Sequence, residues 1–274
     1  MPLIRLLRPM RCLAFLPLAA AVATPVPCPA QTLETESALL LPRGEWKVGG
    51  AYELQTSSEG TEAAGPMILE YGLADRLELV VEPVVYTAIR PKQGVHATGV
   101  GDLETTLVWR FHDASARAPA LALAGEVKVP TARNELIGTG KTDYALYAIA
   151  TRRAGRFDAH ANVSYTFVGR PAGVEVKNLF GYALAGTFHW TPRWDAFAEI
   201  TGNTSSLAGA EQPDAGPGSG GAENPVSPEL AGNELVGTVG LGYYTRPGLL
   251  LFGSVSYDNQ HATLLRFGYT WRFK

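Results

Sequence analysis

The chain has 274 residues, with 23 basic and 26 acidic side chains and a formal net charge of −3. That balance excludes the strongly basic surface by which proteins hold nucleic acid, so no nucleic-acid partner is expected. After the first 30 residues there is no apolar run of about eighteen residues, which excludes a helical membrane span in that part.

The first 30 residues have the layout of a secretory signal peptide. Three arginines and no acid precede an apolar run over 12–23, which is too short to span a bilayer as a helix. Small residues predict cleavage after Ala30. The mature chain, 31–274, then has 20 basic residues (23 − 3 = 20) against 26 acidic ones and no cysteine. A lipid anchor on Cys28 is disfavoured because Pro27 precedes it.

Twelve segments of alternating apolar and polar residues follow. Successive side chains of a strand point to opposite faces, so each segment predicts a strand with one apolar and one polar face. In the last segment the apolar face carries five large side chains, which is typical of contact with lipid. The segments are 45–54, 65–73, 77–87, 100–111, 120–130, 143–152, 156–168, 178–190, 194–203, 233–244, 249–258 and 262–274.

Strands can cross a membrane only as a closed barrel, because lipid offers no partner to an unpaired backbone group. The sequence therefore predicts an all-β fold, a transmembrane antiparallel up-and-down β-barrel of about 12 strands in the outer membrane. Short turns such as 74–76 and 191–193 alternate with longer connections such as 55–64 and 88–99, which predicts short periplasmic turns and longer external loops. The alternative is a secreted β-sandwich, but a sandwich core gives no reason for aromatic residues to gather at strand ends.

The segment 204–232 is rich in Gly, Pro, Ser and Ala and contains acidic residues but no basic ones. Such a composition cannot bury enough apolar surface to order itself. We expect a long flexible external loop here. The alternative is a loop that folds inward and gates the lumen.

Charged residues fall on the face opposite the apolar one and are therefore expected to point into the barrel, since a basic group in mid-membrane costs about 2–4 kcal/mol. If the third and fourth segments pair about the centre of their loop, Glu78 faces Arg110, and Lys128 falls opposite Asp102 or Glu104. The residues expected to line the lumen are Glu78, Glu82, Asp102, Glu104, Arg110, Glu126, Lys128, Asp158, His160, Glu199, Arg266 and Arg272.

Twelve strands lie between small filled barrels and wide porins, so a narrow or gated pore is favoured. Its excess of inward acids predicts a mild preference for cations. The alternatives are a sealed structural barrel and a lipid hydrolase. For catalysis the sequence offers no G-x-S-x-G elbow and no mature cysteine, and His160 and His189 point inward. We therefore expect a non-enzymatic protein with no cofactor and no metal.

The run 137–142 imitates the end of a phosphate-binding loop, but Glu135 stands where that motif needs glycine and a strand follows instead of a helix. Nucleotide binding is therefore rejected. The expected partners are outer-membrane lipid, the periplasmic export and barrel-assembly machinery and a small-molecule solute, and the protein is expected to be a monomer.

Three stretches in sequence order carry a family resemblance. They are Gly99-Val100-Gly101-Asp102-Leu103 running to Trp109-Arg110-Phe111, then 119–131, and then 138–152. Together they resemble the outer-membrane, transporter-like barrel family named for a meta-pathway of phenol degradation. The resemblance implies a barrel of about twelve strands and a role in uptake of small, often aromatic, compounds. Gly101, Asp102 and the corner 140–143 carry it, and they either shape the rim or contact a ligand.

Overall fold

The computed structural model describes residues 33–171, 175–205 and 233–274, and the described residues form strands and connections with no helix that could cross a membrane. The predicted signal peptide over 1–30 and nearly all of the predicted loop 204–232 lie outside the described residues. The strands are β1 (Trp46–Thr56), β2 (Gly60–Ala74), β3 (Leu77–Pro91), β4 (Ala97–Gly99), β5 (Leu103–His112), β6 (Ala120–Val129), β7 (Asp143–Ala154), β8 (Phe157–Phe167), β9 (Leu179–His189), β10 (Trp194–Asn203), β11 (Glu234–Arg246), β12 (Leu249–Asp258) and β13 (Thr263–Phe273).

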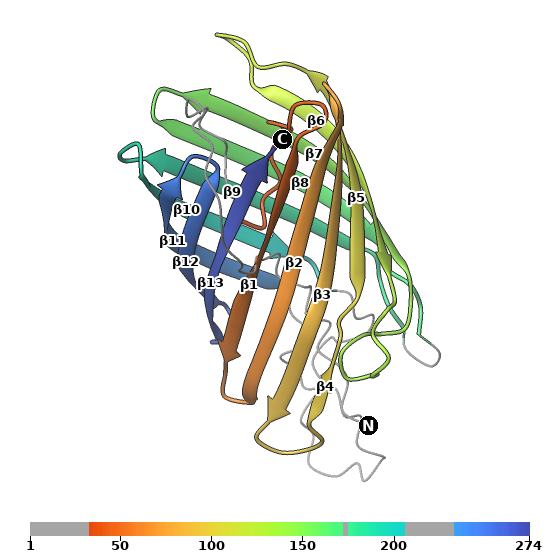
Figure 1. Cartoon of the computed structure of the whole chain (residues 1–274). Coiled ribbons are helices and arrows are strands. Elements are labelled where there is room, and N and C mark those ends of the chain that lie inside the picture. The colour runs from red at the N-terminus through yellow and green to blue at the C-terminus, as the bar shows by residue number, and fades with distance from the viewer. Residues whose placement is uncertain (1–32, 172–174, 206–232) are drawn as a thin grey trace.

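Twelve of these strands close into an antiparallel barrel, as predicted. Each pairs with its neighbours in sequence, and β1 pairs with both β2 and β13, so the sheet has no free edge there (Figure 1). Closure follows from the continuous match of β1 to β13, from Trp46 opposite Phe273 to Thr56 opposite Thr263. The start of β1 and the end of β13 meet at this first pair, at the rim of the short turns.

Two of the expected long connections are shorter than the sequence predicts. β1 and β2 continue pairing as far as Thr56 opposite Thr61, which leaves only 57–59 as the turn. Within the expected connection 88–99, β3 runs on to Pro91 and β4 pairs back onto it. These extensions project beyond the barrel at the long-loop rim (Figure 1).

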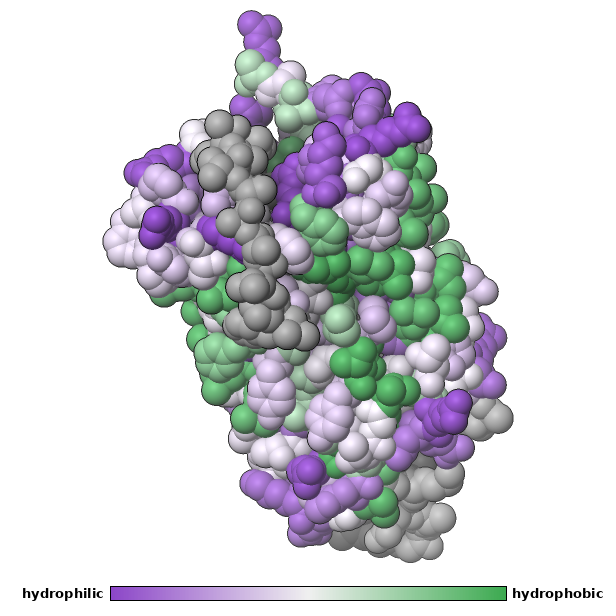
Figure 2. Space-filling model, in the orientation of Figure 1, coloured by the Kyte–Doolittle hydropathy of each residue, from purple (hydrophilic) through white to green (hydrophobic). Residues whose placement is uncertain are grey.

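The outer face of the barrel is apolar and the inner face is polar. On β8, Val163 and Tyr165 are exposed whereas His160, Asn162 and Ser164 are buried, as strand alternation requires. Figure 2 shows hydrophobic side chains across the middle of the visible face and hydrophilic ones towards both ends. Aromatic pairs mark the short-turn end: Trp46–Tyr71, Trp194–Tyr243 and Trp271–Phe273, with ring centroids 4.2, 4.8 and 4.8 Å apart.

The expected pairing of Glu78 with Arg110 is wrong. Glu78 lies opposite Val108, and Arg110 forms an ion pair with Asp113 at the short-turn rim, with 2.9 Å between Nε and Oδ1. β4 and β5 pair with β3 in one register, with Thr87 opposite Gly99 and Glu78 opposite Val108, and this register is two residues away from the expected one. The expectation for Lys128 is confirmed: it lies directly opposite Glu104 and within 4.0 Å of Asp102.

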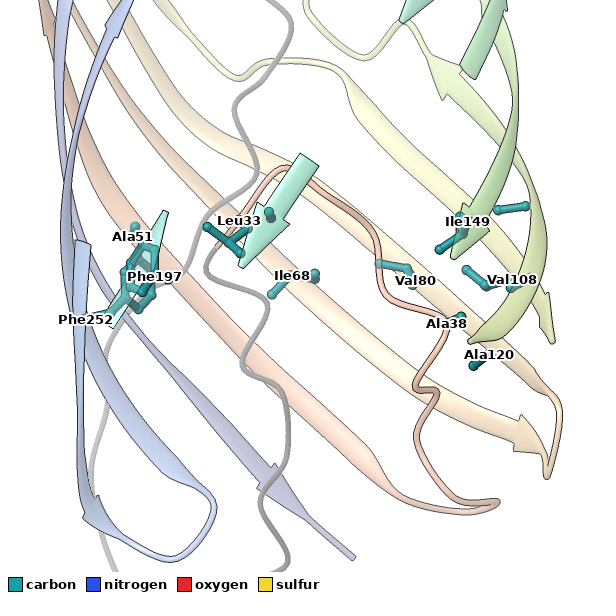
Figure 3. Close-up of a cluster of buried hydrophobic side chains, with 13 residues drawn as sticks. Leu33, Ala38, Ala51, Ile68, Val80, Val108, Ala120, Ile149, Phe197 and Phe252 are labelled. Carbon is teal, nitrogen blue, oxygen red and sulfur yellow. The ribbon is translucent and has the colours of Figure 1, made fainter. Parts of the chain in front are cut away.

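Residues 33–41 enter the barrel and are here called the plug segment. Figure 3 shows this segment running across the lumen between Leu33, which lies beside Phe197, and Ala38, which lies towards Ala120 on the other wall. The link 42–45 joins the plug segment to β1 and is held to β2, since Gly72 donates its N–H to Glu45 O at 3.0 Å. A Cβ on Gly72 would lie 2.2 Å from Pro42 O, so only glycine permits this approach.

The plug segment and the inner wall of the barrel

The tip of the plug segment is held through its backbone by β10. The Glu199 carboxylate accepts the backbone N–H of Glu34 at 3.1 Å and that of Thr35 at 2.6 Å. The Thr35 hydroxyl also donates to it. Glu199 is 3% exposed, so these bonds form away from bulk water, where an unmade bond to a carboxylate is costly. A single wall residue thus recognises two consecutive residues of an extended peptide.

The rest of the plug segment is bound in the same way by other strands. Ala38 donates its N–H to Thr151 Oγ1 at 2.9 Å, and Leu41 donates its N–H to Glu78. The side-chain amide of Asn162 lies 3.1 Å from the carbonyl oxygen of Glu36. Four side chains from β3, β7, β8 and β10 therefore satisfy the backbone of the plug segment, in place of a neighbouring strand.

A buried arginine joins the plug segment to the seam of the barrel. Arg266 on β13 is 1% exposed. Its Nε donates to Glu53 on β1 at 2.8 Å, and its Nη2 donates to the Glu34 carboxylate at 2.6 Å. A charge this deeply buried is stable only when it is paired and hydrogen-bonded, so both carboxylates support it.

Leu33 supplies the apolar contact of the tip. It is 3% exposed and belongs to the same buried cluster as Ala51, Ile68, Phe197 and Phe252. In Figure 3 the labelled phenylalanines lie together on the wall beside Leu33. The tip of the plug segment therefore combines an apolar side chain, a carboxylate and backbone donors at one place on the wall.

Most residues expected to line the lumen are on the inner face and buried, and three are half-buried. Arg110 and Arg272 lie at the short-turn rim, where Arg272 donates to Glu45, and Glu126 accepts the Tyr147 hydroxyl at 3.0 Å. Among the described residues, buried acids outnumber buried bases ten to three. The buried members of the expected set are Glu78, Glu82, Asp102, Glu104, Lys128, Asp158, His160, Glu199 and Arg266.

The motif residues near the long-loop rim hold external connections in place. Asp102 accepts the N–H of Ala132 at 3.0 Å, and Asp143 accepts the N–H of Gly169 at 2.8 Å. Lys128 forms an ion pair with Asp143 and lies near Asp102, so one ammonium group connects the two carboxylates. Of the two roles that the sequence allowed for Asp102, shaping the rim is the one these contacts describe.

A histidine lies between two carboxylates at the short-turn rim. His189 Nε2 is 3.2 Å from Asp158 and Nδ1 is 2.8 Å from Asp195. Arg153 also binds Asp158, through Nε at 2.6 Å. Both ring nitrogens of His189 can donate to these acids only when the ring is protonated.

The functional residues that sequence reasoning missed are those of the plug segment. Residues 33–41 show no strand alternation, and they bind through backbone N–H groups, which every non-proline residue carries. One signal in the sequence could have revealed the plug segment. The stretch between the predicted cleavage site and the first strand is longer than the chain needs to enter a barrel.

Solved structures with this fold are outer-membrane proteins. An outer membrane channel from Pseudomonas putida F1 superposes with a TM-score of 0.66 at 14% identity, covering 88% of this chain and all of that one. The NanC porin gives 0.56 at 10% identity, covering 82% of this chain and 98% of that one. The KdgM porin, solved in complex with disordered oligogalacturonate, gives 0.53 at 9% identity, covering 82% and 99%. At these identities the likeness shows the fold.

No curated protein matches the chain by sequence. A family model does match, over residues 37–273, which includes every strand of the barrel and residues 37–41 of the plug segment. The chain belongs to the family described as "Putative MetA-pathway of phenol degradation".

Proposed function

We propose that this protein is a passive channel for small solutes in the outer membrane, exported by a signal peptide that is cleaved near Ala30. The observation that carries the proposal is the division of side chains between the two faces of a closed barrel. An apolar exterior suits lipid, and a polar, charged interior suits contact with water or solute. The fold shared with a bacterial outer membrane channel and two porins supports the same function.

The plug segment determines when such a channel conducts. Its tip lies against Glu199 and Arg266, and its remaining residues cross the lumen at the short-turn end (Figure 3). Conduction therefore requires the plug segment to shift. The solute would be small, because about eight strands are filled by side chains and 16–18 leave a wide channel. The phenol-degradation family suggests an aromatic compound, and no enzymatic step is part of the proposal.

A planar bilayer experiment with the refolded full chain tests this function. In KCl we expect discrete current steps that become more frequent in Glu199→Gln, which weakens the hold on the tip. Heat-denatured protein is the control. The alternative function, a sealed structural barrel, is favoured by the occupied lumen. Silent membranes with both the wild type and Glu199→Gln would support it and contradict the channel.

A further inference from the structure

Five residues form one continuous row across the inner wall where the tip of the plug segment binds. Phe197 on β10 lies directly opposite Gly240 on β11, Gly240 opposite Ser254 on β12, Ser254 opposite Arg266 on β13, and Arg266 opposite Glu53 on β1. Directly opposed residues have Cβ atoms about 4.5–5.5 Å apart. An aromatic ring, a hydroxyl, a guanidinium and a carboxylate therefore follow one another at one level of the barrel.

Gly240 makes room for the aromatic member of the row. A Cβ at Gly240 would lie 2.3 Å from Phe197 Cζ, so the ring occupies the space that any side chain would take. Phe252 belongs to the same buried cluster and precedes Ser254 by two residues on the same face of β12. The row thus begins with an apolar surface large enough to meet a ring or a branched alkyl group.

Ser254 provides a polar atom that the described residues leave unused. Its side chain is 7% exposed, and its Oγ has no hydrogen-bond partner among the described residues. A buried hydroxyl without a partner is unfavourable, so a ligand that supplies an acceptor at this point gains free energy. The acceptor would lie next to Arg266, on the adjacent strand.

The tip of the plug segment already shows which chemistry this wall accepts. Leu33 packs in the cluster of Phe197 and Phe252, the Glu34 carboxylate binds Arg266 at 2.6 Å, and the N–H of Thr35 binds Glu199 at 2.6 Å. An apolar group, a carboxylate and a hydrogen-bond donor are held within three consecutive residues.

We propose that the same wall binds a small carboxylate that carries a hydrogen-bond donor on an apolar frame, in competition with the plug tip. Arg266 and Ser254 hold the carboxylate, Glu199 accepts the donor, and the two phenylalanines pack on the frame. An aromatic hydroxy acid has all three features. The proposal rests on the lumen being the path of the solute, and it names the class of solute that takes the place of the tip.

Calorimetric titration of the refolded full chain in detergent micelles tests the site, with 4-hydroxybenzoate as the probe and protein-free micelles as the blank. The uncharged isostere 4-hydroxybenzamide should bind at least roughly tenfold more weakly, since it cannot pair with the guanidinium. Arg266→Gln should weaken 4-hydroxybenzoate binding by roughly tenfold or more, and Ser254→Ala by a few-fold. The matched control is Arg110→Gln, an arginine at the short-turn rim that pairs with Asp113 and, among the described residues, not with the plug segment or its link, and it should leave the affinity unchanged.

Glu34→Gln tests the competition and is expected to act in the opposite direction. It removes the carboxylate that occupies Arg266, so binding of 4-hydroxybenzoate should become several-fold tighter, whereas Asp113→Asn, on the partner of Arg110, should not change it. If Arg266→Gln does not fold, Glu34→Gln and Ser254→Ala still decide the question. Equal binding of acid and amide, or an unchanged affinity in these two variants, would overturn the proposal.

The binding site and the channel can fail separately. Current steps in KCl without 4-hydroxybenzoate binding would reject the site and keep the channel, whereas binding with silent membranes would reject the channel alone.

Discussion

The carboxylate of Glu199 accepts a 2.6 Å hydrogen bond from the backbone nitrogen of Thr35, which precedes it by 164 residues. The first part of the described chain is thereby bound to the tenth strand, across the interior of the barrel. A wall side chain that holds a backbone N–H places no demand on the sequence of the segment it binds. Side chains of the tip add to this backbone hold, since the Thr35 hydroxyl also donates to Glu199 and the Glu34 carboxylate binds Arg266.

Replacing Glu199 with glutamine is expected to raise the open probability of the channel. The amide oxygen can still accept one hydrogen bond, but the charge that strengthens three donated bonds is lost. A loss of about 1.5 kcal/mol would shift the equilibrium between bound and released tip by roughly tenfold. Single-channel recording measures this, with Thr201→Val on the same strand as the control. An open probability equal to that of the wild type would show that Glu199 does not hold the plug.

A disulfide is expected to lock the plug segment. Ala38 N lies 2.9 Å from Thr151 Oγ1, and both residues are fully buried. The predicted mature chain contains no other cysteine, so Ala38→Cys with Thr151→Cys offers one pairing. We expect the oxidised double variant to show no current steps and dithiothreitol to restore them. Either single cysteine variant cannot form the disulfide, so it should conduct and should not respond to dithiothreitol. Unchanged conduction by the oxidised form would mean that ions pass beside the plug.

Ile200 and Thr201 provide a test of which face meets lipid. Ile200 is 53% exposed on the outer face, and its neighbour Thr201 points inward. Ile200→Lys should reduce the free energy of unfolding in lipid by about 2–4 kcal/mol, because it places a charge in the membrane. Thr201→Lys should cost much less. Urea titration in vesicles, followed by tryptophan fluorescence, measures both, and equal losses would contradict the assignment of the faces.

Gly240 is expected to tolerate no side chain. In Gly240→Ala the new methyl group would lie 2.3 Å from Phe197 and 2.6 Å from the carbonyl oxygen of Gly253, so backbone as well as ring must move. Overpacking of this kind costs about 1–3 kcal/mol. Gly237 on the same strand has nothing within 4 Å of its Cβ position, so Gly237→Ala is the matched control. Heat-modifiable migration on gels compares their thermal stability. Equal stability of the two variants would contradict the packing described.

The interior charge is expected to make the open channel prefer cations. Buried acids exceed buried bases among the described residues, and Glu126 remains half-buried on the inner face. A fixed negative wall raises the local concentration of cations. In a KCl gradient the reversal potential should therefore favour K⁺, and Glu126→Gln should move it towards zero. Anion preference in the wild type would contradict this prediction.

The strands could be predicted from the sequence because lipid imposes the same alternation on each of them. On β8 every second side chain is apolar and faces outward, and the predicted segment 156–168 differs from Phe157–Phe167 by one residue at each end. Register could not be predicted, since it depends on how a connection folds. β3 pairs with β4 and β5 in one register that sets Glu78 opposite Val108, two residues away from Arg110.

Only the wall residues of the candidate site could be predicted from the sequence, and their partners in the plug segment could not. Glu199 and Arg266 were expected in the lumen because charge is excluded from lipid. Their partners Glu34 and Thr35 could not be predicted, because these contacts use backbone groups or join residues more than 160 positions apart. Ser254 likewise gains its place beside Arg266 only through the register of β12 and β13.

The link 42–45 sets the time course of conduction. Together with residues 36–41 it tethers the tip to β1, and these ten residues reach about 35 Å when extended, so a released tip stays near the mouth of the barrel. Such a tether keeps its local concentration on the order of millimolar, and rebinding is fast compared with that of a free peptide. Current records should therefore show bursts of brief openings, separated by closed times that do not depend on the amount of protein. Lengthening the link with glycines should prolong each opening.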